Sequence, residues 1–212
     1  MHSTEYSSSN GSLPKLFSVL FTALLISFAG IYAGQFVPKA YAIPLYVVEI
    51  GLLLAVFFLR KSKAVGYPLM FAFMFVSGIT LQFAIAYYVS TLGATLVGQA
   101  FALAVVAFGG TALYAVKSKQ DFSYMRGFLV ASTLVLIGIM LVGLFVPMTG
   151  TMELIYSGFG ILIFIGWTLF DFSRLTKHGF AEEDIPSIVV SIYLDFVNLF
   201  LFILRFIGAS RD

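Results

Sequence analysis

The chain has 212 residues, of which 60% are hydrophobic and 10% charged, whereas an ordinary soluble domain is roughly 45–50% apolar and about 25% charged. A membrane-spanning helix needs about 20 mainly apolar residues, so seven such helices use about 140 positions and leave no room for a soluble catalytic domain. The chain has no cysteine, which excludes disulfides, thiolate metal sites and a cysteine nucleophile. The composition therefore predicts a protein whose main solvent is lipid.

Apolar runs separated by short breaks predict an all-α membrane protein with seven spans. Residues 1–13 are polar and rich in serine, which predicts a disordered N-terminal tail, and residues 14–212 are expected to form a single transmembrane domain. The apolar runs show no period-2 alternation, so we expect helices rather than the strands of a membrane barrel. The expected spans lie near residues 15–37, 42–59, 68–89, 92–116, 126–146, 153–173 and 186–207.

The positive charges predict how the chain is oriented in the membrane. Nine of the 12 lysine and arginine residues lie at the start of the first span or around the breaks after the second, fourth and sixth spans. The positive-inside rule therefore places the N-terminus in the cytoplasm and, with seven spans, the C-terminus outside. A six-span alternative, in which the last segment is re-entrant, would move the C-terminus inside.

Charged side chains within the spans are the strongest candidates for function, because each costs about 2.5–3.5 kcal/mol at the middle of a spanning helix. Asp171, Asp195 and Arg60 fall in the cytoplasmic half of the membrane, where they could form one cluster. Glu49 and Arg205 fall in the outer half, where we expect a second pair. Function should therefore be sought at these two levels.

The last span carries its polar groups on one face. At about 100° per residue, Ser191, Asp195, Asn198, Phe202 and Arg205 fall within an arc of roughly 80°. A helix that is otherwise apolar and carries one such face belongs inside a bundle. This face favours a water-filled or ion-conducting path, with Ser191 and Asn198 as candidate lining residues.

Two carboxylates in a low-dielectric site cannot both stay ionised cheaply. If Asp171 and Asp195 come within hydrogen-bonding range, they bind a proton as a pair, which makes them a candidate proton sensor. The alternative for Asp171, near its helix end, is that it faces water and pairs with Arg174. For Glu49 and Arg205, a purely structural ion pair is as well supported as a gating role.

Four segments of the chain are distinctive: KAVGY at 63–67, FVSGIT at 75–80, FDFSR at 170–174 and YLDFVNLFLFILRF at 193–206. In these segments the sequence resembles the Bax-inhibitor family, most closely a bacterial calcium-leak member. The resemblance covers essentially the whole chain after the tail and implies a seven-helix bundle in which the last helix is central and surrounded by the other six. It also implies a pH-sensitive calcium leak channel of the bacterial plasma membrane that works as a monomer and needs no cofactor.

The same resemblance implies roles for individual residues. Asp171 and Asp195 match a carboxylate dyad that senses pH and near which calcium binds transiently, and Arg60 matches an arginine latch. Glu49 and Arg205 match an outer ion pair. The implied partners are calcium ions and the lipid bilayer, and no nucleic acid.

Our leading hypothesis is that protonating the dyad weakens its attraction for Arg60, releases the second span and opens a path for calcium along the last span. An intramembrane aspartyl protease would also use two aspartates on consecutive spans, but the YD and GxGD motifs of such proteases are missing around Asp171 and Asp195. We therefore expect no enzymatic activity. A proton-coupled cation exchanger, which would use the same carboxylates as a relay, is a further alternative.

Overall fold

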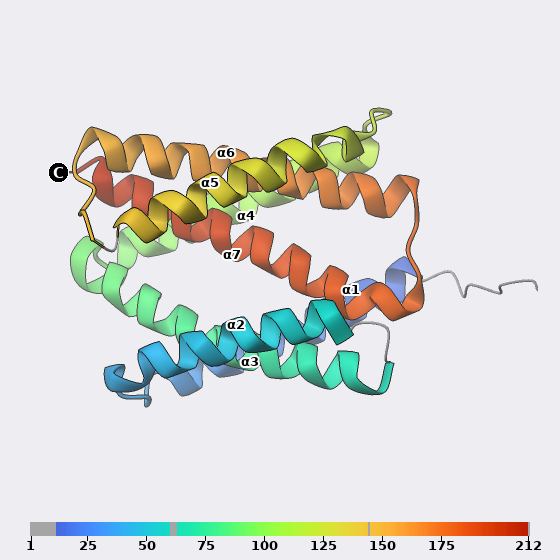
Figure 1. Cartoon of the computed structure of the whole chain (residues 1–212), viewed down its shortest axis with the longest axis horizontal. Helices are drawn as coiled ribbons and strands as arrows, with labels where there is room; N and C mark the ends of the chain where they lie inside the picture. Colours follow the sequence, from blue (N-terminus) through green and yellow to red (C-terminus); the bar gives the residue numbers. More distant parts are fainter. Residues whose placement is uncertain (1–11, 60–62, 144, 212) are drawn as a thin grey trace, which may run out of the picture. The chain divides into compact units, whose positions relative to one another are not determined.

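The structure, a computed structural model, describes residues 12–59, 63–143 and 145–211. Within these ranges seven helices are long and apolar enough to cross a membrane, which confirms the predicted all-α fold (Figure 1). Short 3-10 turns precede three of them, at Lys39–Tyr41, Phe122–Met125 and Glu182–Asp184. The helices are α1 (Leu13–Gly34), α2 (Ala42–Leu59), α3 (Lys63–Leu92), α4 (Ala94–Lys117), α5 (Arg126–Gly143), α6 (Thr151–Lys177) and α7 (Ile185–Ala209).

Two helix ends differ clearly from the expected spans. α3 begins at Lys63 rather than at Pro68, which lies inside the helix. A proline this close to the start of a helix removes only one interior hydrogen bond, so it does not have to be the first residue. α6 continues past residue 173 because Arg174 and Lys177 lie in its last turn, where cations interact favourably with the helix C-terminus.

The described residues belong to two compact units. The first runs to Phe83 and includes His178–Val190, and the second comprises Ala84–Lys177 and the chain from Ser191 onward. Helices α3 and α7 therefore each contribute residues to both units. The single domain expected for residues 14–212 stays a prediction, and the expected tail lies, up to residue 11, outside the described residues.

In the first unit, α1 and α3 cross at glycines. A Cβ atom added to Gly30 would meet the backbone of Phe75 and Gly78, and one added to Gly78 would meet the backbone of Ser27 and Gly30. Helices in lipid associate through close packing rather than through the hydrophobic effect, so small residues at the crossing are what allow the backbones to approach. The two glycines therefore fix how α1 packs on α3.

In the second unit, α6 packs against both α4 and α5 (Figure 1). The core combines small residues of α4, such as Ala100 and Ala104, with large apolar side chains of α6 and α7, such as Phe164 and Phe200. α7 is the most buried span: 61% of its most hydrophobic stretch is buried, against 44% for α6. Most of the apolar stretch of α7 is therefore covered by other parts of the protein.

Candidate functional site

The two aspartates singled out in the sequence both lie in the second unit, on the facing helices α6 and α7. Their carboxylates are close enough to interact electrostatically. Ser191, one turn before Asp195 on α7, donates a hydrogen bond to the carboxylate of Asp171. Asp195 itself is buried, with 5% of its surface exposed. We call Asp171, Ser191 and Asp195 the carboxylate cluster.

The carboxylate cluster is incompletely hydrogen-bonded. The Oδ2 atoms of Asp171 and Asp195 are both buried and have no hydrogen-bond partner within the described parts of the chain. Arg174, one turn after Asp171, interacts with its carboxylate electrostatically but is itself exposed. Buried carboxylate oxygens without partners are costly unless a proton or a cation joins them. The cluster can therefore hold a proton or an oxygen-liganded cation.

Each aspartate of the carboxylate cluster is followed in the sequence by a phenylalanine. Phe172 follows Asp171, Phe196 follows Asp195, and both rings meet Phe108 of α4 edge-on, with centroid distances of 5.8 and 5.6 Å. Aromatic side chains combine a large apolar surface with these preferred edge-to-face contacts. The three rings therefore join α4, α6 and α7 through apolar contacts at residues next in sequence to the two aspartates.

A second polar site lies at the opposite end of α6 and α7. The Nε atom of Arg205 donates to Oε1 of Glu153 over 3.1 Å, and the guanidinium lies over the ring of Tyr156, 4.7 Å from its centroid. Glu153 and Arg205 line a polar cavity of about 520 Å³ together with residues that include Tyr88 and Thr91. We call this the C-terminal cavity.

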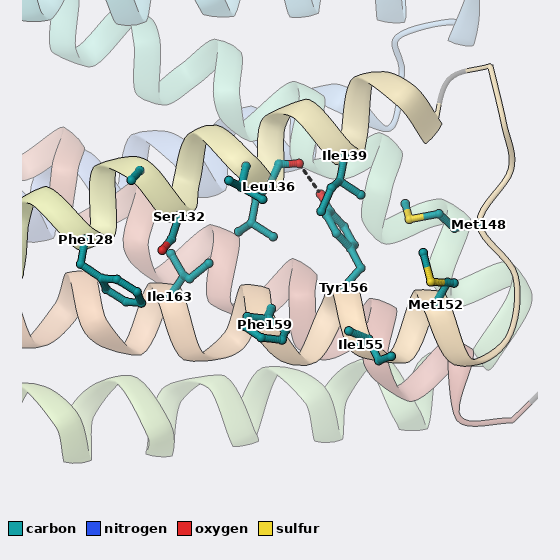
Figure 2. A pocket seen from close by; sticks show the side chains of 12 residues that line it. Phe128, Ser132, Leu136, Ile139, Met148, Met152, Ile155, Tyr156, Phe159 and Ile163 are labelled. Carbon is teal, nitrogen blue, oxygen red and sulfur yellow. Dashed lines mark hydrogen bonds between the residues drawn. The ribbon is translucent and has the colours of Figure 1, made fainter.

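Another cavity, of about 460 Å³, lies between α5 and α6 and is almost wholly apolar (Figure 2). Tyr156 forms part of its wall, and its hydroxyl donates to the carbonyl oxygen of Leu136 over 3.3 Å. Figure 2 shows this hydroxyl pointing from α6 towards α5. The ring of Tyr156 thus lines the apolar cavity and also contacts the guanidinium of Arg205, which lines the C-terminal cavity.

Glu49 and Arg205, the expected outer pair, belong to different units. In the first unit, Glu49 accepts a hydrogen bond of 2.7 Å from Thr80. In the second unit, Arg205 pairs with Glu153, which sequence reasoning missed because Glu153 stands at the edge of the expected span 153–173 and resembles a loop charge. The pairing of Glu49 with Arg205 stays a prediction, and the expected latch Arg60 lies outside the described residues.

The candidate lining residues of α7 are both half-buried. The Nδ2 atom of Asn198 donates to the carbonyl oxygen of Leu194 over 2.8 Å, so part of its amide is satisfied by its own helix. No group of three or more residues suited to hold a resident metal ion occurs in the described ranges. Calcium near Asp171 and Asp195 therefore stays a prediction, as a transported ion.

Replacing Glu153 by Gln should lower the free energy of unfolding by about 1 kcal/mol, because it removes the charge from a hydrogen bond at a partly exposed ion pair. Thermal unfolding in detergent measures the change. The matched control is Glu183→Gln at an exposed position, which should leave the midpoint unchanged. Equal midpoints for the two variants would show that the pair adds nothing to stability.

Comparisons with known proteins identify relatives along the whole chain. The family model described as inhibitor of apoptosis-promoting Bax1 matches residues 9–212. An uncharacterized protein of Campylobacter jejuni is 30% identical over 208 residues, which cover 94% of this chain and 89% of the relative. Bax inhibitor 1 of Schizosaccharomyces pombe is 32% identical over 75% of this chain and 59% of its own. The Golgi anti-apoptotic protein of vaccinia virus is 32% identical over 77% of this chain and 66% of its own. The chain thus spans about three fifths to two thirds of the length of these last two relatives.

Proposed function

The chain belongs to the Bax inhibitor family and is an integral, multi-pass membrane protein, and from this premise we propose that it is a calcium leak channel opened by protonation of Asp171 and Asp195. The observation that carries the proposal is the carboxylate cluster: two interacting acidic side chains on adjacent spans, each with a buried oxygen that lacks a partner in the described chain. Ionisable residues at such positions are expensive in a membrane and mark ion or proton pathways.

Protonation changes the cluster in a defined way. When both carboxylates are ionised, they repel each other and attract a nearby cation. When one of them takes up a proton, it can donate a hydrogen bond to the other, and the pair loses one of its two negative charges. We propose that this loss of charge releases Arg60, which follows α2 in the sequence, and so frees the end of α2. Acid then favours the open state.

The carboxylate cluster also suits the proposed ion. Calcium takes oxygen ligands, including carboxylates, and accepts irregular coordination. Two carboxylates without further charged ligands would bind it weakly, which a conducting site requires, since the ion must also leave. The distribution of lysine and arginine supports placing this cluster in the cytoplasmic half and the C-terminal cavity on the outer side.

Calcium flux into proteoliposomes tests this function. Purified protein should admit calcium down its gradient, and the rate should rise as the pH falls from about 8 to about 6, while empty liposomes stay tight. A dye for internal pH separates a leak from an exchanger, because a leak moves no protons in fixed proportion to calcium. Calcium flux that is absent at every pH, protons that move in a fixed ratio, or aspartate-dependent cleavage of a transmembrane peptide would each contradict the proposal.

A further inference from the structure

One aromatic ring interrupts the polar face of α7. The face runs from Asp195 through Asn198 to Arg205, and Phe202 stands on it one turn from each of the last two. Any ion or water that passes along this face between the carboxylate cluster and the C-terminal cavity must therefore pass Phe202. The ring is half-buried, so part of its surface is not covered by neighbouring side chains.

The ring of Phe202 packs against Tyr156, Gly160 and Phe164 of α6, which we call its seat. A Cβ atom added to Gly160 would collide with three ring carbons of Phe202, so a glycine there is what admits the ring. One turn to either side of this glycine, Phe164 stacks on the ring with a centroid distance of 5.7 Å and an interplanar angle of 26°, and Tyr156 meets it at 5.5 Å and 57°. Spacing by four residues places Tyr156, Gly160 and Phe164 on one face of α6. Phe202 is thus held between two rings.

The seat is linked to the C-terminal cavity. Tyr156 is fixed by its hydrogen bond to Leu136, drawn as a dashed line in Figure 2, and its ring lies under the guanidinium of Arg205. Phe164, Phe202 and Tyr156 therefore form a stack that ends on the ion pair of Arg205 with Glu153. A movement of Arg205 changes the support of the ring that holds Phe202.

We infer that Phe202 is the constriction of the conducting path and closes it by excluding water between the carboxylate cluster and the C-terminal cavity. Apolar constrictions stop ions because an ion cannot shed its hydration shell without replacement ligands. Phe202 presents an apolar ring at the one level of the polar face where Asp195, Asn198 and Arg205 supply no ligand. This inference rests on the proposed function and adds to it the residue that limits permeation.

Replacing Phe202 by Ala should raise calcium flux into proteoliposomes at about pH 8 by about tenfold, which corresponds to about 1.4 kcal/mol in a barrier. Phe206→Ala is the matched control, because Phe206 lies one turn further along α7 and its ring also lies near a glycine of α6: a Cβ atom added to Gly158 would be 3.7 Å from it. It stands outside the polar face and should leave the flux unchanged. If the wild-type protein conducts in acid but the Phe202→Ala variant stays closed at about pH 8, the inference about Phe202 is overturned while the proposed function stands.

Two further variants keep the test valid if the alanine variant folds poorly. Phe202→Leu keeps an apolar side chain and should stay closed at about pH 8, whereas Phe202→Asn, which differs from Leu mainly in polarity, should leak. Equal flux in these two variants would contradict closure by an apolar barrier. A wild-type protein that conducts calcium at no pH would instead contradict the proposed function, so the two failures are distinguishable.

Cysteine labelling gives a readout that does not depend on calcium. The natural chain has no cysteine, so Asn198→Cys and Thr91→Cys each introduce a single thiol. A membrane-impermeant methanethiosulfonate reagent added to intact cells should label Thr91→Cys, in the C-terminal cavity, with or without Phe202. It should label Asn198→Cys only when Phe202 is also replaced by Ala. Equal labelling of Asn198→Cys with Phe202 in place would overturn the inference.

Discussion

The Asp195→Asn variant should already show at about pH 8 the calcium flux that the wild-type protein reaches at about pH 6. Its own flux should change by less than about twofold between these two pH values. Asparagine has the shape of a protonated aspartate but cannot ionise, so the carboxylate cluster keeps the reduced charge that acid gives it. Because Asp195 is buried beside Asp171, this substitution removes both the repulsion and the shared proton. Calcium flux in proteoliposomes across the pH range measures the effect.

The Asp171→Asn variant supplies an internal check on this prediction. It should also lose the pH dependence of calcium flux, and the double variant should add nothing further, because residues that act as one unit give non-additive effects. Glu183→Gln, at an exposed position outside the cluster, should titrate like the wild type. An unchanged pH dependence in both aspartate variants would remove the two carboxylates from the mechanism.

Replacing Gly78 by Ala should destabilise the protein by about 1–3 kcal/mol, the usual cost of forcing extra volume into a packed contact. The added Cβ would meet the backbone of Ser27 and Gly30 rather than a flexible side chain, so α1 and α3 would have to move apart. We expect a lower midpoint of thermal unfolding in detergent and a smaller yield of monodisperse protein.

A second glycine provides the control for Gly78→Ala. Gly98 lies inside α4, and a Cβ added there would meet nothing within 4 Å. Gly98→Ala should therefore leave the midpoint of unfolding unchanged or raise it, by up to about 1 kcal/mol, because alanine favours the helix more than glycine does. If both alanine variants unfolded at the wild-type temperature, the close crossing of α1 and α3 would not limit stability.

The seven spans were predictable because lipid imposes one requirement on every segment: a long apolar run with its backbone hydrogen bonds closed internally. The ends were less predictable where chemistry competes with hydrophobicity. Pro68 suggested a helix start that α3 does not use, and Arg174 with Lys177 suggested a loop although both lie in the last turn of α6. Charge near a helix C-terminus is compatible with the helix as well as with a loop.

The candidate site was predictable in part. Asp171 and Asp195 stand out because charged residues are rare in spans, and the structure brings them together on α6 and α7. The pairing of Glu153 with Arg205 depends on the antiparallel register of the two helices, which no single span reveals. The contact of Phe202 with Gly160 was hidden for a similar reason: an apolar residue on a polar face acquires a meaning only when its seat on the facing helix is known.

The central claim is that protonation of Asp171 and Asp195 opens the path for calcium. Infrared difference spectra of the protein in lipid bilayers detect the carbonyl stretch of a protonated carboxyl group, and calcium flux can be recorded in the same preparation from about pH 8 to about pH 6. We predict that the protonated carboxyl band and the calcium flux rise with the same midpoint, and that neither changes with pH in the Asp171→Asn, Asp195→Asn double variant. Calcium flux that rises in acid while the carboxyl band of these aspartates stays constant would contradict the account.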